Sequence, residues 1–486
     1  MIHLIQNLMT SPWVLVSIFF LLILILIFLS EYSYRKNILK PNINRKIIHL
    51  TVGVAISFSP FIFTSKIQPL ILAIIFLIIN HISYKKNRLK SFHNINRESY
   101  GTVFFPLAYI LIATLFWQYK YIISCSFMIL AVSDPLSSLI GENLKKPHQY
   151  RINKDFKSYE GSATMFISTF IILSLFSNLI FHQFNLLHSI ITILICSITI
   201  TFTEAVSIKG SDNLSIPITS FFIIEMFNKV NEQKFIIEFL VMIVTIIVLL
   251  FYFYKKKHLS LNGLLSSALM AVLILGFGGL VYLLPIATFF ILSTLLSKIG
   301  SKHIQKSKSG RTTYQVIANG GIGLLLCIIN HFHQTDLIFY MFLSSIAAAN
   351  SDTWATEIGK LSKTRPKDII SGRRLKQGQS GGITFIGSLG SIVGSFVIAI
   401  IGFFLSIDHL YLILIFIAGF VGSLLDSILG STIQSRFISL DGRTITEKRV
   451  ENSHLYSGLR VINNDTVNLV CTISGPMIFA LILIFV

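Results

Sequence analysis

The sequence contains little charge for its length. Asp, Glu, Lys and Arg make up 13% of the 486 residues, whereas soluble domains carry about 25%. Hydrophobic residues make up 53%. They gather in apolar runs such as 13–29, 235–254 and 466–486, which are long enough to cross a bilayer. The shortage of charge excludes an ordinary soluble protein, and the runs indicate an integral membrane protein.

Signatures of several other protein classes are also missing. The four cysteines, Cys125, Cys196, Cys327 and Cys471, are isolated in or beside apolar runs. This spacing fits neither a disulfide framework nor a metal site, so we expect them to fill the core. The first apolar run has no basic segment before it, which predicts an anchor with its N-terminus outside, not a cleaved signal peptide. The absence of a P-loop and of a protein-kinase signature excludes a soluble NTPase fold.

The apolar runs predict an all-α polytopic membrane protein with about 14–16 transmembrane helices. The number is a range because the run 214–228 is short enough to be re-entrant. The candidate spans are 11–30, 47–64, 67–84, 100–118, 121–141, 162–181, 186–207, 214–228, 235–254, 259–275, 277–297, 314–330, 337–359, 382–406, 409–433 and 466–486.

Basic residues concentrate on one side of this predicted topology. With the N-terminus outside, all of the 40 Lys and Arg residues except Lys66, Lys120, Lys229 and Lys234 fall in inside segments, as the positive-inside rule expects. The net charge of +19 therefore indicates loops beside anionic lipid and not nucleic-acid binding. The inside segments are 31–46, 84–99, 142–161, 208–213, 255–258, 298–313, 360–381 and 434–465.

Two stretches of the sequence resemble each other. Residues 133–141 read SDPLSSLIG and residues 351–359 read SDTWATEIG, and both continue into a basic stretch. Each is followed by a small-residue motif before the next span, KSYEGSAT at 157–164 and QGQSGGIT at 377–384. Such landmarks in the same order indicate an internal duplication.

Two further landmarks extend the duplication. Each half has an acidic residue in an apolar stretch, Glu204 or Asp426, followed by an Asn/Asp cluster at 212–213 or 463–465. In the predicted topology both Ser-Asp spans cross in the same direction, so the duplication is parallel, unlike the inverted repeats of many transporters. The two predicted modules are residues 1–230 and 256–486.

Acidic side chains inside apolar spans are functional candidates, because a charge there costs about 2.5–3.5 kcal/mol on insertion scales. The residues that qualify are Asp134, Glu204, Asp352, Glu357 and Asp426. The alternative is that each lies near the interface and pairs with a nearby Lys. This alternative is weakest for Asp134 and Asp352, because the residues around each of them are repeated around the other. Pro135 directly after Asp134 predicts a helix break there.

The basic loops supply complementary charge. Cations in 142–161 and 360–382 precede small residues at the start of a span, and amide groups at a helix N-terminus favour phosphate. Nearby carboxylates would hold Mg²⁺, which prefers one or two carboxylates together with phosphate oxygens. The pattern therefore suits a nucleoside triphosphate bound at the membrane face.

At the level of motifs, the first module resembles the phytol kinase and dolichol kinase family of membrane-bound, CTP-dependent polyprenol kinases. Its matching segments are RKIIHLTVG (45–53), SYGTVFFPLA (99–108), SDPLSSLIGENLKK (133–146), KSYEGSATMF (157–166) and EAVSIKGSDNLSIP (204–217). The second module resembles the phytyl-phosphate kinase family, long catalogued as an uncharacterised membrane domain. Its matching segments are SGRTTYQVIANGG (309–321), ANSDTWATEIGKLSK (349–363), GQSGGIT (378–384), GSLLDSILGSTIQ (422–434) and NNDTVNL (463–469).

The resemblance implies a bifunctional membrane kinase. The first module would phosphorylate an isoprenoid alcohol of the phytol, farnesol or geranylgeraniol type, and the second would convert the monophosphate to the diphosphate. The implied donor is CTP, or ATP or UTP, with Mg²⁺, and the implied location is a bacterial cytoplasmic membrane with the catalytic loops on the cytoplasmic side. Because an alcohol must lose a proton, Asp134 is the candidate general base. A phosphate monoester is already largely ionised, so the second module needs charge neutralisation more.

The loops and the family motifs together predict the site residues. The catalytic candidates are Asp134 and Asp352. The predicted metal ligands are Asp134, Glu204, Asp352, Asp426 and Asp465. The predicted nucleotide- and phosphate-binding residues are Ser133, Gly141, Lys145, Lys157, Glu160, Gly161, Asp212, Asn213, Arg311, Gly359, Lys363, Arg373, Arg374, Gly381 and Asn464.

Two other functions stay open at this point. A cytidylyltransferase that forms a CDP-lipid would use the same nucleotide and similar carboxylates. A lipid transporter or flippase would also carry acidic residues inside the membrane, although the parallel repeat and the loops on one side argue against it.

Overall fold

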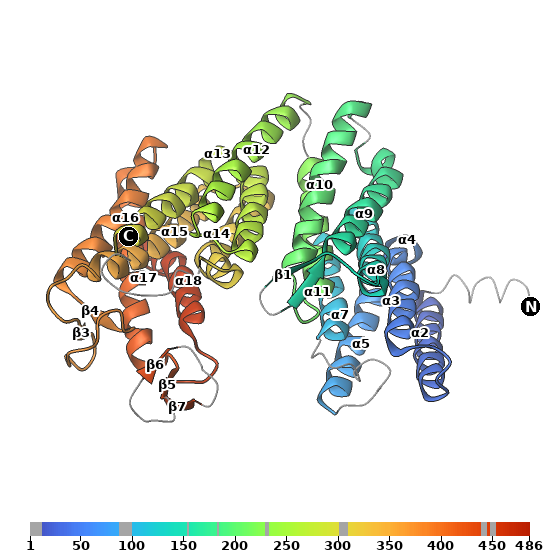
Figure 1. The fold of residues 1–486 in the computed structure, drawn as a ribbon. Helices are drawn as coiled ribbons and strands as arrows, with labels where there is room; N and C mark the ends of the chain where they lie inside the picture. The colour runs from blue at the N-terminus through green and yellow to red at the C-terminus, as the bar shows by residue number, and fades with distance from the viewer. Residues whose placement is uncertain are drawn as a thin grey trace, which may run out of the picture. The chain divides into compact units, whose positions relative to one another are not determined.

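The computed structural model describes residues 12–86, 100–152, 155–181, 184–228, 233–300, 310–438, 445–447 and 453–486. They form two compact units, Met1–Met242 and Ile243–Val486, each of them a helical bundle (Figure 1). Parts of the predicted inside segments 84–99, 298–313 and 434–465 lie outside the described residues, as does Lys229.

Unit 1 is built of helices and one short hairpin, and α12 contains the boundary with unit 2. Its helices are α2 (Pro12–Arg35), α3 (Pro41–Ser57), α4 (Ser59–Ile62), α5 (Ile67–Lys85), α7 (Gly101–Phe116), α8 (Lys120–Asn143), α9 (Tyr159–Ile180), α10 (Leu186–Val206), α11 (Asp212–Asn228) and α12 (Gln233–Lys255). The antiparallel strands β1 (Gln149–Ile152) and β2 (Asp155–Ser158) connect α8 to α9.

Unit 2 has longer polar connections between its helices. Its helices are α13 (Leu261–Gly300), α14 (Thr313–His333), α15 (Asp336–Gly359), α16 (Phe385–Phe404), α17 (His409–Thr432) and α18 (Asn464–Leu483). Its strands are β3 (Lys367–Asp368), β4 (Gly382–Ile383), β5 (Arg436–Ile438), β6 (Ile445–Thr446) and β7 (His454–Ser457), which form one antiparallel pair, β3–β4, and one three-stranded sheet, β6–β5–β7. A positive φ of 66° at Gly279 kinks α13, so this one element covers two predicted spans, 259–275 and 277–297.

The predicted fold class is confirmed. Twelve helices in the described part of the chain are long and apolar enough to cross a membrane, and a helix lies over every predicted span. Three predicted spans are not among the twelve: α7 is shorter, α11 has 17 residues, and α15 ends in a polar segment. The four cysteines are buried and free, as expected of core residues.

Several helix pairs of unit 1 have counterparts in unit 2, although α15 packs in addition against α14 and α17. In unit 1, α8 packs against α3, α9 and α11; in unit 2, α15 packs against α13, α16 and α18. The pairs α9–α10, α10–α11 and α7–α11 likewise have counterparts in α16–α17, α17–α18 and α14–α18. This correspondence is what a duplicated module would produce, and it makes α8 and α15 equivalent.

Small residues let α16 approach α15 closely. A Cβ added at Gly390 or Gly394 would lie 3.0 Å from a backbone carbonyl oxygen of α15. Asn350 donates to the carbonyl of Gly394 at 2.7 Å, and Ser351 donates to that of Ser391 at 2.8 Å. These buried bonds fix the turn of α15 that carries Asp352.

Candidate functional site

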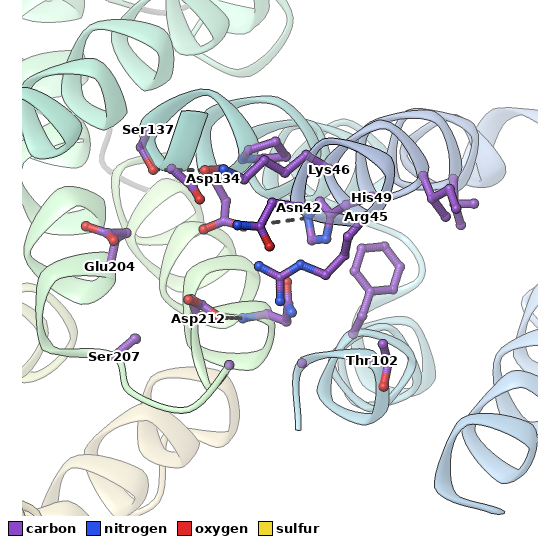
Figure 2. Close-up of a pocket in the computed structure, with 18 of the residues that line it drawn as sticks. Asn42, Arg45, Lys46, His49, Thr102, Asp134, Ser137, Glu204, Ser207 and Asp212 are labelled. Carbon is purple, nitrogen blue, oxygen red and sulfur yellow. Dashed lines mark hydrogen bonds and ion pairs between the residues drawn. The ribbon is translucent and has the colours of Figure 1, made fainter. Parts of the chain in front are cut away.

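Unit 1 contains a cavity of about 1050 Å³. Its polar end is formed by the start of α3, the C-terminal part of α8, the hairpin, and the adjoining ends of α9, α10 and α11. Figure 2 shows Asp134, Glu204 and Asp212 around this space, with Arg45 and His49 reaching into it from α3. The polar ends of separate helices therefore meet on one side of the unit.

Asp134 lies in the middle of this polar end. Its Oδ2 is 4.0 Å from Nε2 of His49, and the same ring nitrogen lies 3.2 Å from the carbonyl oxygen of Leu130. The predicted helix break at Pro135 is wrong, because α8 continues from Lys120 to Asn143. Membrane helices tolerate proline where surrounding protein buries the interrupted turn, and Pro135 is buried within α8.

Lys157 connects the hairpin to the end of α10. It donates to the carboxylate of Glu204 and, at 3.2 Å, to the Glu204 main-chain carbonyl. Burial alone would lower the pKa of Lys157, but the negative charges of Glu204 and Asp212 outweigh burial and raise that pKa above its usual value. Lys157 therefore stays a cation at the mouth of the cavity.

Two glycines bring α8 and the start of α9 together. Ser158 caps α9 by accepting a hydrogen bond from the Gly161 amide at 3.1 Å. A Cβ at Gly141 would lie 2.7 Å from the Ser158 hydroxyl oxygen, and one at Gly161 would lie 3.1 Å from the carbonyl oxygen of Ser137. Only glycine permits this approach, which places the N-terminus of α9 beside the cavity.

Some predicted residues of unit 1 line the cavity and others do not. Those that line it are Asp134, Gly141, Lys157, Gly161, Glu204, Asp212 and Asn213. Ser133 is instead buried and accepts from Thr169 at 3.3 Å. Lys145 is exposed away from the cavity. Glu160 accepts from the amide of His148 at 3.0 Å, on the outside of the hairpin.

The polar face of α3 also lines the cavity, although no α3 residue was among the predicted site residues. Asn42, Arg45, Lys46 and His49 all face it, and Lys46 forms an ion pair of 2.5 Å with Glu142. In the sequence, Arg45 and Lys46 precede an apolar span and so look like ordinary topology signals. A helical wheel of 42–49 would have shown that these side chains share one face.

Unit 2 contains the corresponding cavity, of about 1920 Å³. It is lined by the start of α14, the C-terminal part of α15, the loop 376–384, the end of α17 and the start of α18. The predicted residues that line it are Arg311, Asp352, Gly359, Gly381, Asp426, Asn464 and Asp465. Lys363, Arg373 and Arg374 are exposed and lie outside its lining.

Two carboxyl groups meet in this cavity. Asp352 on α15 and Asp426 on α17 lie close enough for their charges to interact, and Oδ1 of Asp426 is buried with no hydrogen-bond partner among the described residues. Carboxylates this close repel each other unless they share a proton or a cation. One turn further along α15, Glu357 is paired with Lys360 at 2.6 Å.

A folded loop lies beside these carboxylates. Asp368 accepts from the amide of Ser371 at 2.8 Å and from the hydroxyl of Ser431, on α17, at 2.7 Å. Burial opposes ionisation of Asp368, but these hydrogen bonds outweigh it and lower the pKa to about 2. Gly381 has a φ of 81°, and a Cβ there would lie 2.6 Å from the Ser431 backbone. The loop is therefore fixed to the end of α17.

Cations border the second cavity. Arg311 is half-buried, with its guanidinium 5.4 Å from the ring centroid of Phe290. Desolvation lowers its pKa to about 10, so it remains charged at neutral pH. Arg436 donates to the carbonyl oxygens of Ser380 and Gly430, each at 3.0 Å. Other lining residues that were not predicted are Lys360, Lys376, Arg436, Glu447 and Arg460.

The structure changes the alignment of the two repeats. Thr384 caps α16 and accepts from the Gly387 amide at 3.0 Å, as Ser158 does from Gly161 on α9. Gly359 lies against Thr384 as Gly141 lies against Ser158. The counterpart of KSYEGSAT is thus 383–390, so pairing it with QGQSGGIT at 377–384 was wrong. Glycine-rich composition alone misplaced the match.

The donor sets fit a hydrated Mg²⁺ better than a dedicated metal cage. Among the described residues, no three His, Cys, Asp or Glu side chains form a ready metal site. Mg²⁺ commonly binds one or two carboxylates and completes its shell with water and phosphate oxygens. Asp134 with Asp212, and Asp352 with Asp426, provide such pairs.

Comparison with known proteins places unit 2 in a family. The model for the integral membrane protein family DUF92 matches residues 244–476. An uncharacterized membrane protein of Methanocaldococcus jannaschii is 32% identical over 258 residues, which is 52% of this chain and 98% of that protein. The chain belongs to the DUF92 family. The matched range contains every unit 2 residue predicted for the site.

Two other relatives of this DUF92 protein are more distant. A phytol kinase of Synechocystis is 26% identical over 221 residues, or 44% of this chain and 92% of that protein. The chloroplastic protein VTE6 of Arabidopsis thaliana is 23% identical over 246 residues, or 47% of this chain and 68% of that protein. Each relative thus aligns with about half of the chain. No solved structure matches it.

Proposed function

We propose that the protein makes an isoprenoid diphosphate in two phosphoryl transfers. Unit 1 phosphorylates an isoprenoid alcohol, and unit 2 phosphorylates the resulting monophosphate, each with a nucleoside triphosphate and Mg²⁺. The observation that carries the proposal is the arrangement found in both units: carboxylates and cations gather where a glycine lets a helix N-terminus approach the cavity. The distant relation to a phytol kinase supports the substrate class.

In unit 1 the reaction needs a base and positive charge. The hydroxyl oxygen of the alcohol attacks the γ-phosphorus, the bond to the β-phosphate oxygen breaks, and the nucleoside diphosphate leaves. Asp134 accepts the hydroxyl proton, since it lies at the polar centre of the cavity. Lys157 and Arg45 attract the phosphates, and Mg²⁺ would neutralise charge on the transferring group.

In unit 2 the nucleophile is a phosphate oxygen, which is already ionised near neutral pH. The main difficulty is therefore repulsion between anions, not removal of a proton. Asp352 and Asp426 would share the cation, while Arg311, Lys360 and Arg436 border the phosphates. The need to offset this repulsion is consistent with the many Lys and Arg side chains that line the unit 2 cavity.

A product assay tests the proposal. The purified full-length protein is given geranylgeraniol or phytol, Mg²⁺, and CTP, ATP or UTP labelled in the γ-phosphate. We expect labelled monophosphate first and diphosphate later, with release of the nucleoside diphosphate. Release of pyrophosphate and formation of a CDP-lipid would instead show cytidylyltransferase chemistry, and no lipid product with any nucleotide would contradict the proposal.

The proposed location is the cytoplasmic membrane of a bacterium, with both cavities open to the cytoplasmic nucleotide pool. Cysteine substitutions at Lys145 and Lys363, which are exposed in the loops beside the two cavities, test this orientation in intact cells. We expect protection of both positions from a membrane-impermeant thiol reagent. Labelling of either one in sealed cells would place its loop outside.

A further inference from the structure

The unit 1 cavity continues beyond its polar end into an apolar slot. This part lies between α2, α3, α5 and α7, and side chains from all four helices line it. Representative lining residues are Ile23, Val52, Ile56, Leu72, Phe76 and Phe105. The proposed chemistry does not use this region, since its carboxylates and cations all lie at the other end.

Three side chains close the far end of the slot. Phe63 is only 2% exposed, and its ring packs edge-on against Phe19 with the centroids 5.5 Å apart. Beside it, the hydroxyl groups of Tyr109 and Ser59 are hydrogen-bonded at 2.6 Å, and both residues are buried. Aromatic packing and a satisfied hydrogen bond hold these three side chains in place, and we call them the floor of the slot.

The depth of the slot follows from α3, which runs along it. His49 lies at the polar end and Ser59, at the start of α4, lies at the floor. This separation of ten positions corresponds to about 15 Å at 1.5 Å per residue. An extended carbon chain advances about 1.3 Å per bond, given a bond length near 1.5 Å. Each isoprene unit adds four chain bonds, so the slot accommodates roughly three isoprene units.

We infer that this slot holds the prenyl chain of the substrate and that Phe63, with the Tyr109–Ser59 pair, sets its maximum length. The inference rests on the proposed function, because it places the hydroxyl group beside Asp134 and the chain along α3. It assigns the best substrate as an alcohol of about farnesol length, roughly three isoprene units, and excludes long polyprenols such as undecaprenol.

Variants that move the floor in opposite directions test the inference. Phe63→Ala deepens the slot, and Phe63→Leu does so with less loss of packing. Ile56→Trp fills the slot partway along. The matched control is Phe58→Ala, since Phe58 flanks α4 at its other end but is 45% exposed and lies outside the cavity lining.

The measurement is direct binding of geraniol, farnesol, geranylgeraniol, geranylfarnesol and undecaprenol to the purified protein in detergent, without nucleotide, followed by phosphorylation of the same alcohols. We expect the wild type and Phe58→Ala to prefer farnesol and geranylgeraniol to undecaprenol by at least about tenfold. Phe63→Ala and Phe63→Leu should improve relative binding of geranylfarnesol severalfold, and Ile56→Trp should weaken geranylgeraniol more than geraniol.

The two readouts separate the slot from the reaction. Phosphorylation whose length preference does not change in these variants would overturn the slot. So would equal binding of undecaprenol and geranylgeraniol by the wild type. Length-dependent binding that shifts as expected, without phosphorylation of any alcohol, would support the slot and overturn only the proposed reaction.

Discussion

Lys157 on β2 donates hydrogen bonds to both the carboxylate and the main-chain carbonyl of Glu204 at the end of α10. The contact holds the β1–β2 hairpin over the polar end of the first cavity. It also joins a lysine that the sequence singled out in a basic loop to an acidic residue that it singled out in an apolar span. One cation thus has two tasks: it compensates a buried carboxylate and provides positive charge for a phosphate.

Lys157→Met should abolish phosphorylation of the alcohol and destabilise unit 1. Removing one partner of a buried pair leaves an uncompensated charge and costs about 3–5 kcal/mol. Unfolding temperature and monophosphate formation are measured together. Lys146→Met, a change at an exposed lysine before the same hairpin, should alter neither.

The double variant Lys157→Met/Glu204→Gln separates the two tasks. It should recover most of the lost stability, because no buried charge is left unpaired, but not the activity. Recovery of both would show that Lys157 has only a structural role. Since the folded-state pKa of Lys157 is raised, its contribution to stability should be complete below the unfolded pKa of about 10.4 and lost as the pH rises through the higher folded value.

Asp426→Asn should weaken Mg²⁺ binding and so raise the Mg²⁺ concentration that the second transfer requires. Oδ1 of Asp426 has no hydrogen-bond partner among the described residues, so it is available as a ligand beside Asp352. We expect the Mg²⁺ concentration for half-maximal diphosphate formation to rise at least about tenfold. Asp408→Asn, which changes the N-cap at the other end of α17, should leave it unaltered, and an equal shift in both variants would contradict the assignment.

Asp368→Asn should release the loop that borders the second cavity. The hydrogen bonds from Ser371 and Ser431 lower the pKa of Asp368 to about 2, so the carboxylate contributes about 2 kcal/mol. Because the folded pKa is depressed, this contribution is present above the unfolded value of about 3.9 and is lost as the pH falls through about 2. Hydrogen exchange of the backbone amides of 367–383 at neutral pH should accelerate in the variant. Unchanged exchange would contradict the role of Asp368 in fixing this loop to the end of α17.

Gly161→Ala and Gly387→Ala should each impair one transfer only. The added Cβ at Gly161 would lie 2.9 Å from the Ser158 hydroxyl, and that at Gly387 would lie 2.8 Å from the Thr384 hydroxyl. Such overpacking costs about 1–3 kcal/mol. Gly321→Ala is the control, since its Cβ would meet only the Ile317 side chain, at 3.3 Å. The measurement is the temperature at which half of each activity is lost. If either variant lost both activities together, that result would argue against separate sites.

The sequence predicted the helices well because membrane spans are apolar over their whole length. It also predicted the site residues that are out of place in lipid, such as Asp134, Glu204 and Asp426, since burying a charge without a function is costly. All three line a cavity. Their roles as metal ligands or catalytic groups stay predictions.

The sequence predicted loop residues less well, because a basic loop does not show which of its side chains turn inward. Lys145 and Lys157 belong to the same predicted loop, yet only Lys157 is held at the cavity, by strand pairing and by Glu204. Arg45 was missed because it resembles a topology signal. Gly387 was missed because the nearby run 378–382 is richer in glycine, whereas the glycine that lies against Thr384 and Gly359 is in the first turn of α16.

The most direct test of two separate sites compares Asp134→Asn with Asp352→Asn in one assay, using γ-labelled nucleotide with either geranylgeraniol or its monophosphate. Asp134→Asn should form no monophosphate from the alcohol but still convert added monophosphate to diphosphate. Asp352→Asn should accumulate monophosphate and form no diphosphate. Wild-type monophosphate formation by Asp134→Asn, continued diphosphate formation by Asp352→Asn, or loss of both steps in either variant would contradict the assignment of one transfer to each unit.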